Sequence, residues 1–283
     1  MFFQLIINGL LMGCVYSLNA VGLSLIFGVV GLINFAYSDF MMIAMYLCYW
    51  LYLMFCLDPL FSIPLAILFC AFLGWLTYFL IIKWILKATG LVQALSTFAL
   101  GIILRNLVVL VFGQDYHLIN DSIVSGQIFW GDLTINTAMM FAAFISIVAS
   151  AALWTFLTRT KTGLGLRATA INRQAASLMG INSPRMFVLA FVIGSSCVGV
   201  AGAALSSFYY IYPYIGAVFS IITFTTIALG GFGSIPGAFI AGLIIGLVES
   251  FSGFYFDPSL KYAVIFLLYI CVIVVKPKGL KGW

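Results

Sequence analysis

The segment RTKTGLGLRATAINRQAASLMGINSPR, residues 159–185, is the one long polar stretch of the chain that has a strong charge. It contains five basic residues and no acidic residue: Arg159, Lys161, Arg167, Arg173 and Arg185. Membrane proteins carry an excess of Lys and Arg in the loops that face the cytoplasm. We therefore expect a cytoplasmic loop here, held between two membrane spans.

The second half of this loop predicts a short helix over residues 174–179. Asn172 can cap its start, Gly180 is suited to its end, and Pro184 then begins the next span. Such a helix could receive force from a soluble partner. A basic loop that only sets the topology of the chain is the alternative, and composition alone leaves both open.

The rest of the chain is too apolar for a soluble protein. Of its 283 residues, 65% are hydrophobic and 7% are charged, with a mean hydropathy of +1.23. Spans of about 20 apolar residues are required to cross a bilayer. The chain is therefore predicted to be an all-α polytopic membrane protein. Its net charge of +5 follows from the cytoplasmic loops and predicts no binding of nucleic acid.

Charge-free runs predict eight or nine transmembrane segments in a single domain, residues 1–283. The halves are near 1–113 and 137–283, and the coupling loop is at 159–185. The predicted spans are 3–27, 40–57, 60–82, 91–112, 137–158, 186–207, 217–229, 238–251 and 261–275.

The loops between these spans differ in charge. Residues 113–136 contain Asp115, Asp121 and Asp132 but no Lys or Arg, which is typical of the outer side. A second outer turn is expected at Asp257 and Pro258. Lys276, Lys278 and Lys281 place the C-terminus inside, whereas the side of the N-terminus stays open.

Two interruptions of apolar runs resemble each other. GVVGLINFA at residues 28–36 and GGFGSIPGA at 230–238 share four identities in register. Paired Gly- or Pro-broken segments in the two halves of a transporter indicate the substrate path, although glycines that only permit close helix packing give the same pattern. The predicted path residues are Gly28, Gly31, Asn34, Tyr37, Asp39, Gly230, Gly231, Gly233, Pro236 and Gly237.

Two charges stand within apolar runs, Arg105 and Glu249. Charged groups at membrane depth usually face the bundle interior and find partners. We therefore predict that Arg105 and Glu249 pair with each other.

Motifs for catalysis are missing from the chain. It has no G-x-x-x-x-G-K-[ST] phosphate loop, no H-E-x-x-H pair and no G-x-S-x-G elbow. The six cysteines lie in apolar stretches without the spacing of metal ligands. We predict no catalytic residue, no metal and no cofactor, and hence a protein that is not an enzyme.

Several stretches resemble the permease subunits of bacterial ABC importers for branched-chain amino acids. GLSLIFG at 22–28 with GLINFA at 31–36 is similar to the N-terminal signature of that family. QAASLMGIN at 174–182 resembles its E-A-A-x-x-x-G coupling loop, with Gln174 in place of Glu. PYIG at 213–216, LGGFGSIPG at 229–237 and PKGL at 277–280 are also similar. The family usually has His-Gly-Glu where this chain has Tyr37, Ser38 and Asp39.

This resemblance implies a location, a substrate and partners. The chain would lie in the bacterial inner membrane and translocate branched-chain amino acids. Partners would be ATPase subunits, a second related permease, an external binding protein, the small amino-acid substrate and membrane lipid. The ATPase would dock on Arg173, Gln174, Ala175, Ala176, Gly180, Ile181 and Asn182.

Two alternatives stay open at the level of sequence. Members of the same superfamily carry urea, short amides or other small solutes such as sugars. A stand-alone secondary carrier would need its own ion-coupling acids, and the apolar runs contain few.

Overall fold

The computed structural model describes residues 2–119, 122–130, 133–255, 260–276 and 279–280. Asp121, Asp132, Asp257, Pro258, Pro277, Lys278 and Lys281 therefore lie outside the described residues. Seven helices of the described part are long and apolar enough to span a membrane, with α3, η1 and α4 counted as one continuous helix. They are α1 (Phe2–Val30), α2 (Tyr37–Phe55), α3–η1–α4 (Pro59–Thr77, Tyr78–Ile82, Lys83–Ile85), α5 (Gly90–Phe112), α6 (Thr137–Arg159), α9 (Ser183–Leu205) and α11 (Ile235–Tyr255).

Two further apolar helices are shorter, α10 (Ile215–Gly230) and α12 (Lys261–Val275). The predicted spans thus correspond to helices in the structure, and the ends differ by a few residues. The largest difference is α11, which has 21 residues because it begins directly at Ile235 and continues to Tyr255. The prediction of an all-α polytopic membrane protein is confirmed in this coarser form.

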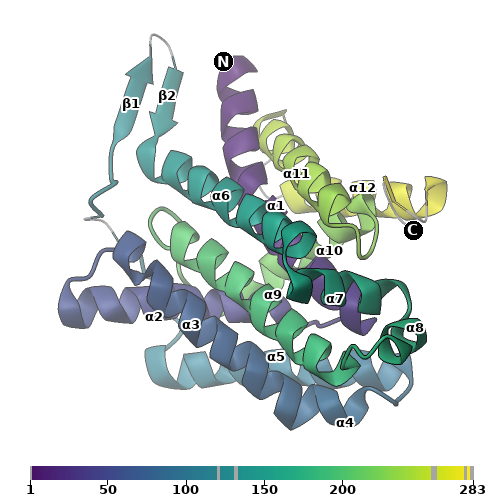
Figure 1. The fold of residues 1–283 in the computed structure, drawn as a ribbon. Helices are drawn as coiled ribbons and strands as arrows, with labels where there is room; N and C mark the ends of the chain where they lie inside the picture. The colour runs from purple at the N-terminus through teal and green to yellow at the C-terminus, as the bar shows by residue number, and fades with distance from the viewer. Residues whose placement is uncertain (1, 120–121, 131–132, 256–259, 277–278, 281–283) are drawn as a thin grey trace.

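The helix α1 forms the centre of the bundle, and α11 packs antiparallel along it (Figure 1). Glycines allow this close approach: a Cβ added to Gly13 would lie 2.9 Å from the Cα of Leu243 and 3.0 Å from the carbonyl oxygen of Gly242. Small residues at a helix interface let two backbones approach closely in a membrane. The inner two-thirds of α1 is buried as a result.

The two polar loops contain structure beyond the prediction. The basic loop holds α7 (Lys161–Ile171) in addition to the short helix α8 (Arg173–Leu178). The side chain of Thr160 starts α7 by accepting a hydrogen bond from the N–H of Gly163 at 3.0 Å. The acidic loop forms a hairpin, β1 (Gln127–Trp130) paired antiparallel with β2 (Leu133–Asn136).

The hairpin and the helices of the basic loop lie at opposite ends of the bundle. Figure 1 shows β1, β2 and the N-terminus at one end of α6, and α7 and α8 at the other. The side chain of Gln4 in α1 exchanges hydrogen bonds with the backbone of Thr134 in β2. The N-terminus therefore lies on the side of the acidic loop, a point that the sequence left open.

The predicted pairing of Arg105 with Glu249 is wrong. Arg105 instead forms a two-pronged ion pair with Asp39, at 2.7 Å from Nε to Oδ1 and 3.1 Å from Nη2 to Oδ2. Glu249 binds Lys261 at 2.9 Å and also accepts a hydrogen bond from the Tyr16 hydroxyl. The physical reason is proximity: α5 lies beside the start of α2, whereas Glu249 faces α1 and α12.

Candidate functional site

The short helix α8 is built by caps at both ends. The side-chain oxygen of Asn172 accepts hydrogen bonds from the N–H groups of Gln174 and Ala175, both at 3.0 Å. Gly180 ends the segment with φ at +82°, a conformation that favours glycine. Asn182 then caps α9 by accepting from the N–H of Arg185 at 3.1 Å. The predictions for Asn172 as a cap and Gly180 as a stop agree with this geometry.

The last turn of α8 exposes apolar side chains at the end of the bundle away from the hairpin. Leu178 is 89% exposed and Met179 is 83% exposed, while Ala176 on the inner side is buried. Exposed apolar side chains that lie on a polar loop rather than in the hydrocarbon region indicate a surface for another protein. Gln174, Ala175 and Gly180 are exposed beside them, and Ile181 is half-buried.

Arg173, the first residue of α8, connects this helix to the end of α1. Its guanidinium donates a hydrogen bond to the carbonyl oxygen of Val30, the last residue of α1. It also lies 4.7 Å from the centre of the Phe187 ring in α9. Gly31, the residue after Val30, has a φ of +72° and lies beside the Arg173 guanidinium. A movement of α8 would therefore be transmitted directly to the break in the chain after α1, at Val30 and Gly31.

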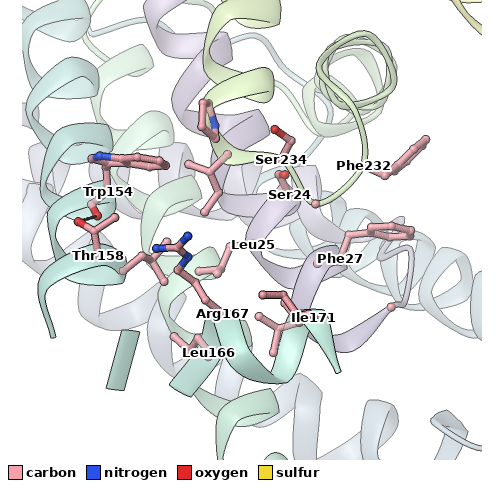
Figure 2. Close-up of a pocket in the computed structure, with 18 residues that line it drawn as sticks. Ser24, Leu25, Phe27, Trp154, Thr158, Leu166, Arg167, Ile171, Phe232 and Ser234 are labelled. Atoms are coloured by element: carbon pink, nitrogen blue, oxygen red, sulfur yellow. Dashed lines mark hydrogen bonds between the residues drawn. The ribbon is translucent and has the colours of Figure 1, made fainter. Parts of the chain in front are cut away.

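A cavity of about 620 Å³ lies between the ends of α1 and α6, the helix α7 and the turn before α11 (Figure 2). Its wall contains four of the predicted path residues, Gly28, Gly31, Gly233 and Pro236. Two of these come from the first break and two from the second. Most of the other lining residues are apolar, among them Leu25, Phe27, Val29, Leu157, Phe232 and Ile235.

The two helix breaks meet in this wall. A Cβ added to Gly28 would lie 3.2 Å from the Cα of Gly233, so the two segments are in direct backbone contact. The rings of Phe27 and Phe232 pack beside this contact with centroids 4.9 Å apart. Segments that are about 200 positions apart in the chain thus form one feature at the C-terminal ends of α1 and α10.

Six predicted path residues lie outside the cavity wall. Gly230, Gly231 and Gly237 form the tight turn between α10 and α11, where a Cβ on Gly230 would lie 2.5 Å from the N of Ala238. The other three, Asn34, Tyr37 and Asp39, are buried within the bundle. The Tyr37 hydroxyl donates to the carbonyl oxygen of Gly194 at 2.9 Å, and the Asn34 amide oxygen accepts from the N–H of Ala36 at 3.1 Å.

The cavity also contains residues that sequence reasoning missed. Arg167 from α7 and Trp154 and Thr158 from α6 line it, together with Ser24 and Ser234. Arg167 belongs to the basic loop, and Ser24 and Ser234 lie within the stretches 22–28 and 229–237 quoted above, but no pattern in the sequence distinguishes any of the three as a lining residue. Their common location follows from the packing of α1, α6 and α7, which no local pattern in the sequence encodes.

No group of three or more His, Cys, Asp or Glu side chains that could hold a metal ion is found among the described residues. The described features are a short capped helix with exposed apolar side chains, an arginine that connects it to α1, and a largely apolar cavity.

Comparisons with known proteins cover nearly the whole chain. The family model for the permease component of branched-chain amino acid transport systems matches residues 5–273. The high-affinity branched-chain amino acid transport system permease protein LivH of Salmonella typhimurium is 34% identical over 99% of this chain and 96% of its own length. The corresponding protein BraD of Pseudomonas aeruginosa is 30% identical with the same coverage.

A more distant match is the fructose import permease protein FrcC of Rhizobium meliloti, which is 26% identical over 50% of this chain and 41% of its own. No match was found among solved structures.

Proposed function

The chain belongs to the family of permease components of branched-chain amino acid transport systems. On this basis we propose how the helices of its basic loop drive transport. It is a multi-pass protein of the bacterial inner membrane and the permease subunit of an ATP-driven (ABC) importer for branched-chain amino acids. It is a transport subunit and not an enzyme, because ATP hydrolysis in such systems belongs to separate ATPase subunits. A binding protein that delivers the substrate is the other general partner of such an importer.

We propose that α8 and its flanking residues, Arg173 to Asn182, are the surface that docks into the ATPase. The exposed Leu178 and Met179 supply apolar contact area, and the caps at Asn172 and Gly180 hold the helix in one shape. A short capped helix is a rigid element that can transmit force without first having to fold. A second, related permease would pack beside this chain and complete the pore.

The observation that carries the mechanism is the shared cavity. It joins both helix breaks to α7, and α7 is separated from α8 by the single residue Asn172. Movement of the ATPase would shift α8, and Arg173 would pull on the carbonyl of Val30 at the first break. We propose that the cavity is the inner end of the translocation path and that Gly28, Gly31, Gly233 and Pro236 line it.

We also propose nine crossings in a single domain of two related halves. Gln4 binds the hairpin at one end of the bundle, while the N–H of Leu280 donates to the carbonyl oxygen of Leu229 beside the second break at the other. Chain ends on opposite sides require an odd number of crossings, and nine apolar helices are described. Gly31 and Gly233, which match in the repeat, both have positive φ, and this equivalence supports a duplicated break.

The test is to purify this protein from membranes together with its ATPase partner and to reconstitute the complex with the binding protein. Uptake of radiolabelled L-leucine into proteoliposomes should require ATP. The variant Ala175→Glu places a charge on the exposed face of α8 and should abolish co-purification of the ATPase. Thr162→Glu, an equal charge change on exposed α7, is the matched control and should leave co-purification intact.

Two results would contradict the proposal. Uptake that continues without ATP while an ion gradient is maintained would indicate a secondary carrier. Retention of the ATPase by the Ala175→Glu variant, with normal uptake, would exclude α8 as the docking surface.

A further inference from the structure

One hydroxyl in the wall of the cavity has no hydrogen-bond partner. Ser24 in α1 is 0% exposed and lines the cavity, yet its Oγ contacts no donor or acceptor among the described residues. Other hydroxyls in these helices donate to the carbonyl four residues earlier, as Ser17 does to Gly13 and Thr223 does to Phe219, both at 2.7 Å. A buried polar group without a partner costs free energy, so Ser24 is suited to a ligand that supplies one.

The N-terminus of α11 meets the same cavity. Its first two residues, Ile235 and Pro236, line the wall, and Ser234 lies directly before them. The Ser234 oxygen accepts from the N–H of Gly237 at 3.3 Å, which leaves its own O–H without an acceptor among the described residues. The start of a helix carries a partial positive charge and favours bound anions.

A full positive charge lies in another part of the wall of the same cavity, on α7. Of the described residues that line the cavity, Arg167 is the charged one, and no acid accompanies it. Its guanidinium makes no hydrogen bond within the described chain, and Figure 2 shows it pointing into the space below Trp154, with Thr158 and Leu25 on either side. The wall of one cavity therefore contains two unused hydroxyl donors, a helix N-terminus and a positive charge.

We propose that Ser24, Ser234, the start of α11 and Arg167 form a subsite for the carboxylate of the transported amino acid. This inference rests on the proposed function, because it assumes that the cavity is part of the path. The two hydroxyls donate hydrogen bonds, and Arg167 supplies the compensating charge. The apolar side chains of Phe27, Leu157 and Ile235 in the same wall accommodate a branched aliphatic side chain.

The test measures binding of radiolabelled L-leucine to the purified permease–ATPase complex without the binding protein. Two competitors distinguish recognition of the carboxylate of leucine from recognition of its amine. The acid 4-methylpentanoate keeps the carboxylate and lacks the amine, whereas 3-methylbutylamine keeps the amine and lacks the carboxylate. The acid should displace leucine, and the amine should not.

Variants locate the subsite. Ser24→Ala and Arg167→Gln should each weaken leucine binding about tenfold, since a hydrogen bond to a charged group is worth about that factor. Ser24→Thr retains the hydroxyl and should bind nearly as well as the parent. The matched controls are Ser146→Ala, a buried serine of α6 whose hydroxyl donates to Ala142, and Arg185→Gln. Neither residue lines the cavity.

The two proposals fail in different ways. Unchanged leucine binding in Ser24→Ala and Arg167→Gln, equal competition by the amine, or no binding to the parent complex would overturn the carboxylate subsite alone. Full leucine uptake by a reconstituted importer carrying Gly28→Leu, which places a side chain against Gly233 where the two breaks meet in the cavity wall, would overturn the path itself. Gly90→Leu is the control for that substitution, because a side chain at Gly90 meets no atom within 4 Å.

Discussion

The ion pair of Asp39 with Arg105 shows how a single residue is held at membrane depth. The Asp39 side chain is fully buried and that of Arg105 is 16% exposed. Glycines give the carboxylate room on both sides, since a Cβ on Gly216 would lie 2.5 Å from Oδ1 and a Cβ on Gly101 would lie 2.5 Å from Oδ2. The pair therefore holds α2 against α5. A side chain in place of Gly101 or Gly216 would collide with the carboxylate.

Loss of one partner should be more harmful than loss of both. Arg105→Met leaves Asp39 buried and unpaired, so the variant should lose about 3 kcal/mol of stability. The double variant Asp39→Asn with Arg105→Met should recover most of that loss, because no charge remains buried. The measurement is the thermal unfolding midpoint in detergent.

The neighbouring Asn106→Ala serves as the control for this prediction, because Asn106 is exposed on α5 and should leave the midpoint unchanged. A double variant that is no more stable than Arg105→Met alone would show that the pair is not the source of the effect.

At the scale of the elements, charge-free runs and single glycines were sufficient to predict most helices. The end of α1 near Gly28 and Gly31, the break at Gly231 and Gly233, and the caps of α8 all depend on local chemistry. The helix α7 was missed because its sequence mixes glycine, basic and apolar residues without a clear period. The hairpin was missed because each strand has only four residues, and neither QIFW nor LTIN gives a clear signal for a strand in a loop next to a membrane span.

The cap of α8 should determine how well the ATPase is retained. Asn172→Ala removes two hydrogen bonds from the first turn and should cost about 1 kcal/mol of helix stability. Retention of the ATPase on purification should fall about fivefold. Asn172→Asp, which keeps an accepting oxygen, should behave like the parent protein. Equal losses in both variants would point to a contact of the amide itself with the partner.

At the scale of the whole molecule, the orientation follows from contacts that no single segment contains. The N-terminal residues bind the hairpin of the acidic loop, and the basic helices lie at the far end (Figure 1). Ion pairs between different helices, such as Arg105 with Asp39 and Glu249 with Lys261, likewise depend on tertiary packing. For this reason the sequence predicted the presence of charged groups but paired them wrongly. The cavity also depends on tertiary packing, and the sequence predicted four of its lining residues.

A topology measurement tests this arrangement in intact cells. A single reactive cysteine introduced before Phe2, in a variant from which exposed Cys56 and Cys271 have been removed, should react with a membrane-impermeant maleimide added from outside. A cysteine at Ser177 in α8 should react only after the membrane is permeabilised. Labelling of both positions from the same side would contradict the opposite placement of the chain end and α8.

We infer that α8 acts on the helix break after α1 through Arg173, and leucine uptake per ATP hydrolysed is the measurement that tests this. The reconstituted importer would carry Arg173→Ala, with Arg185→Ala as the control, because Arg185 is also exposed in the same loop but makes no side-chain hydrogen bond within the described chain. If α8 acts in this way, Arg173→Ala should retain the ATPase and hydrolyse ATP, because the guanidinium binds Val30 and the Phe187 ring within this chain while the rest of α8 supplies the docking surface. It should move at least about fivefold less leucine per ATP, as loss of a charged hydrogen bond implies. A ratio equal to that of Arg185→Ala and of the parent protein would contradict it.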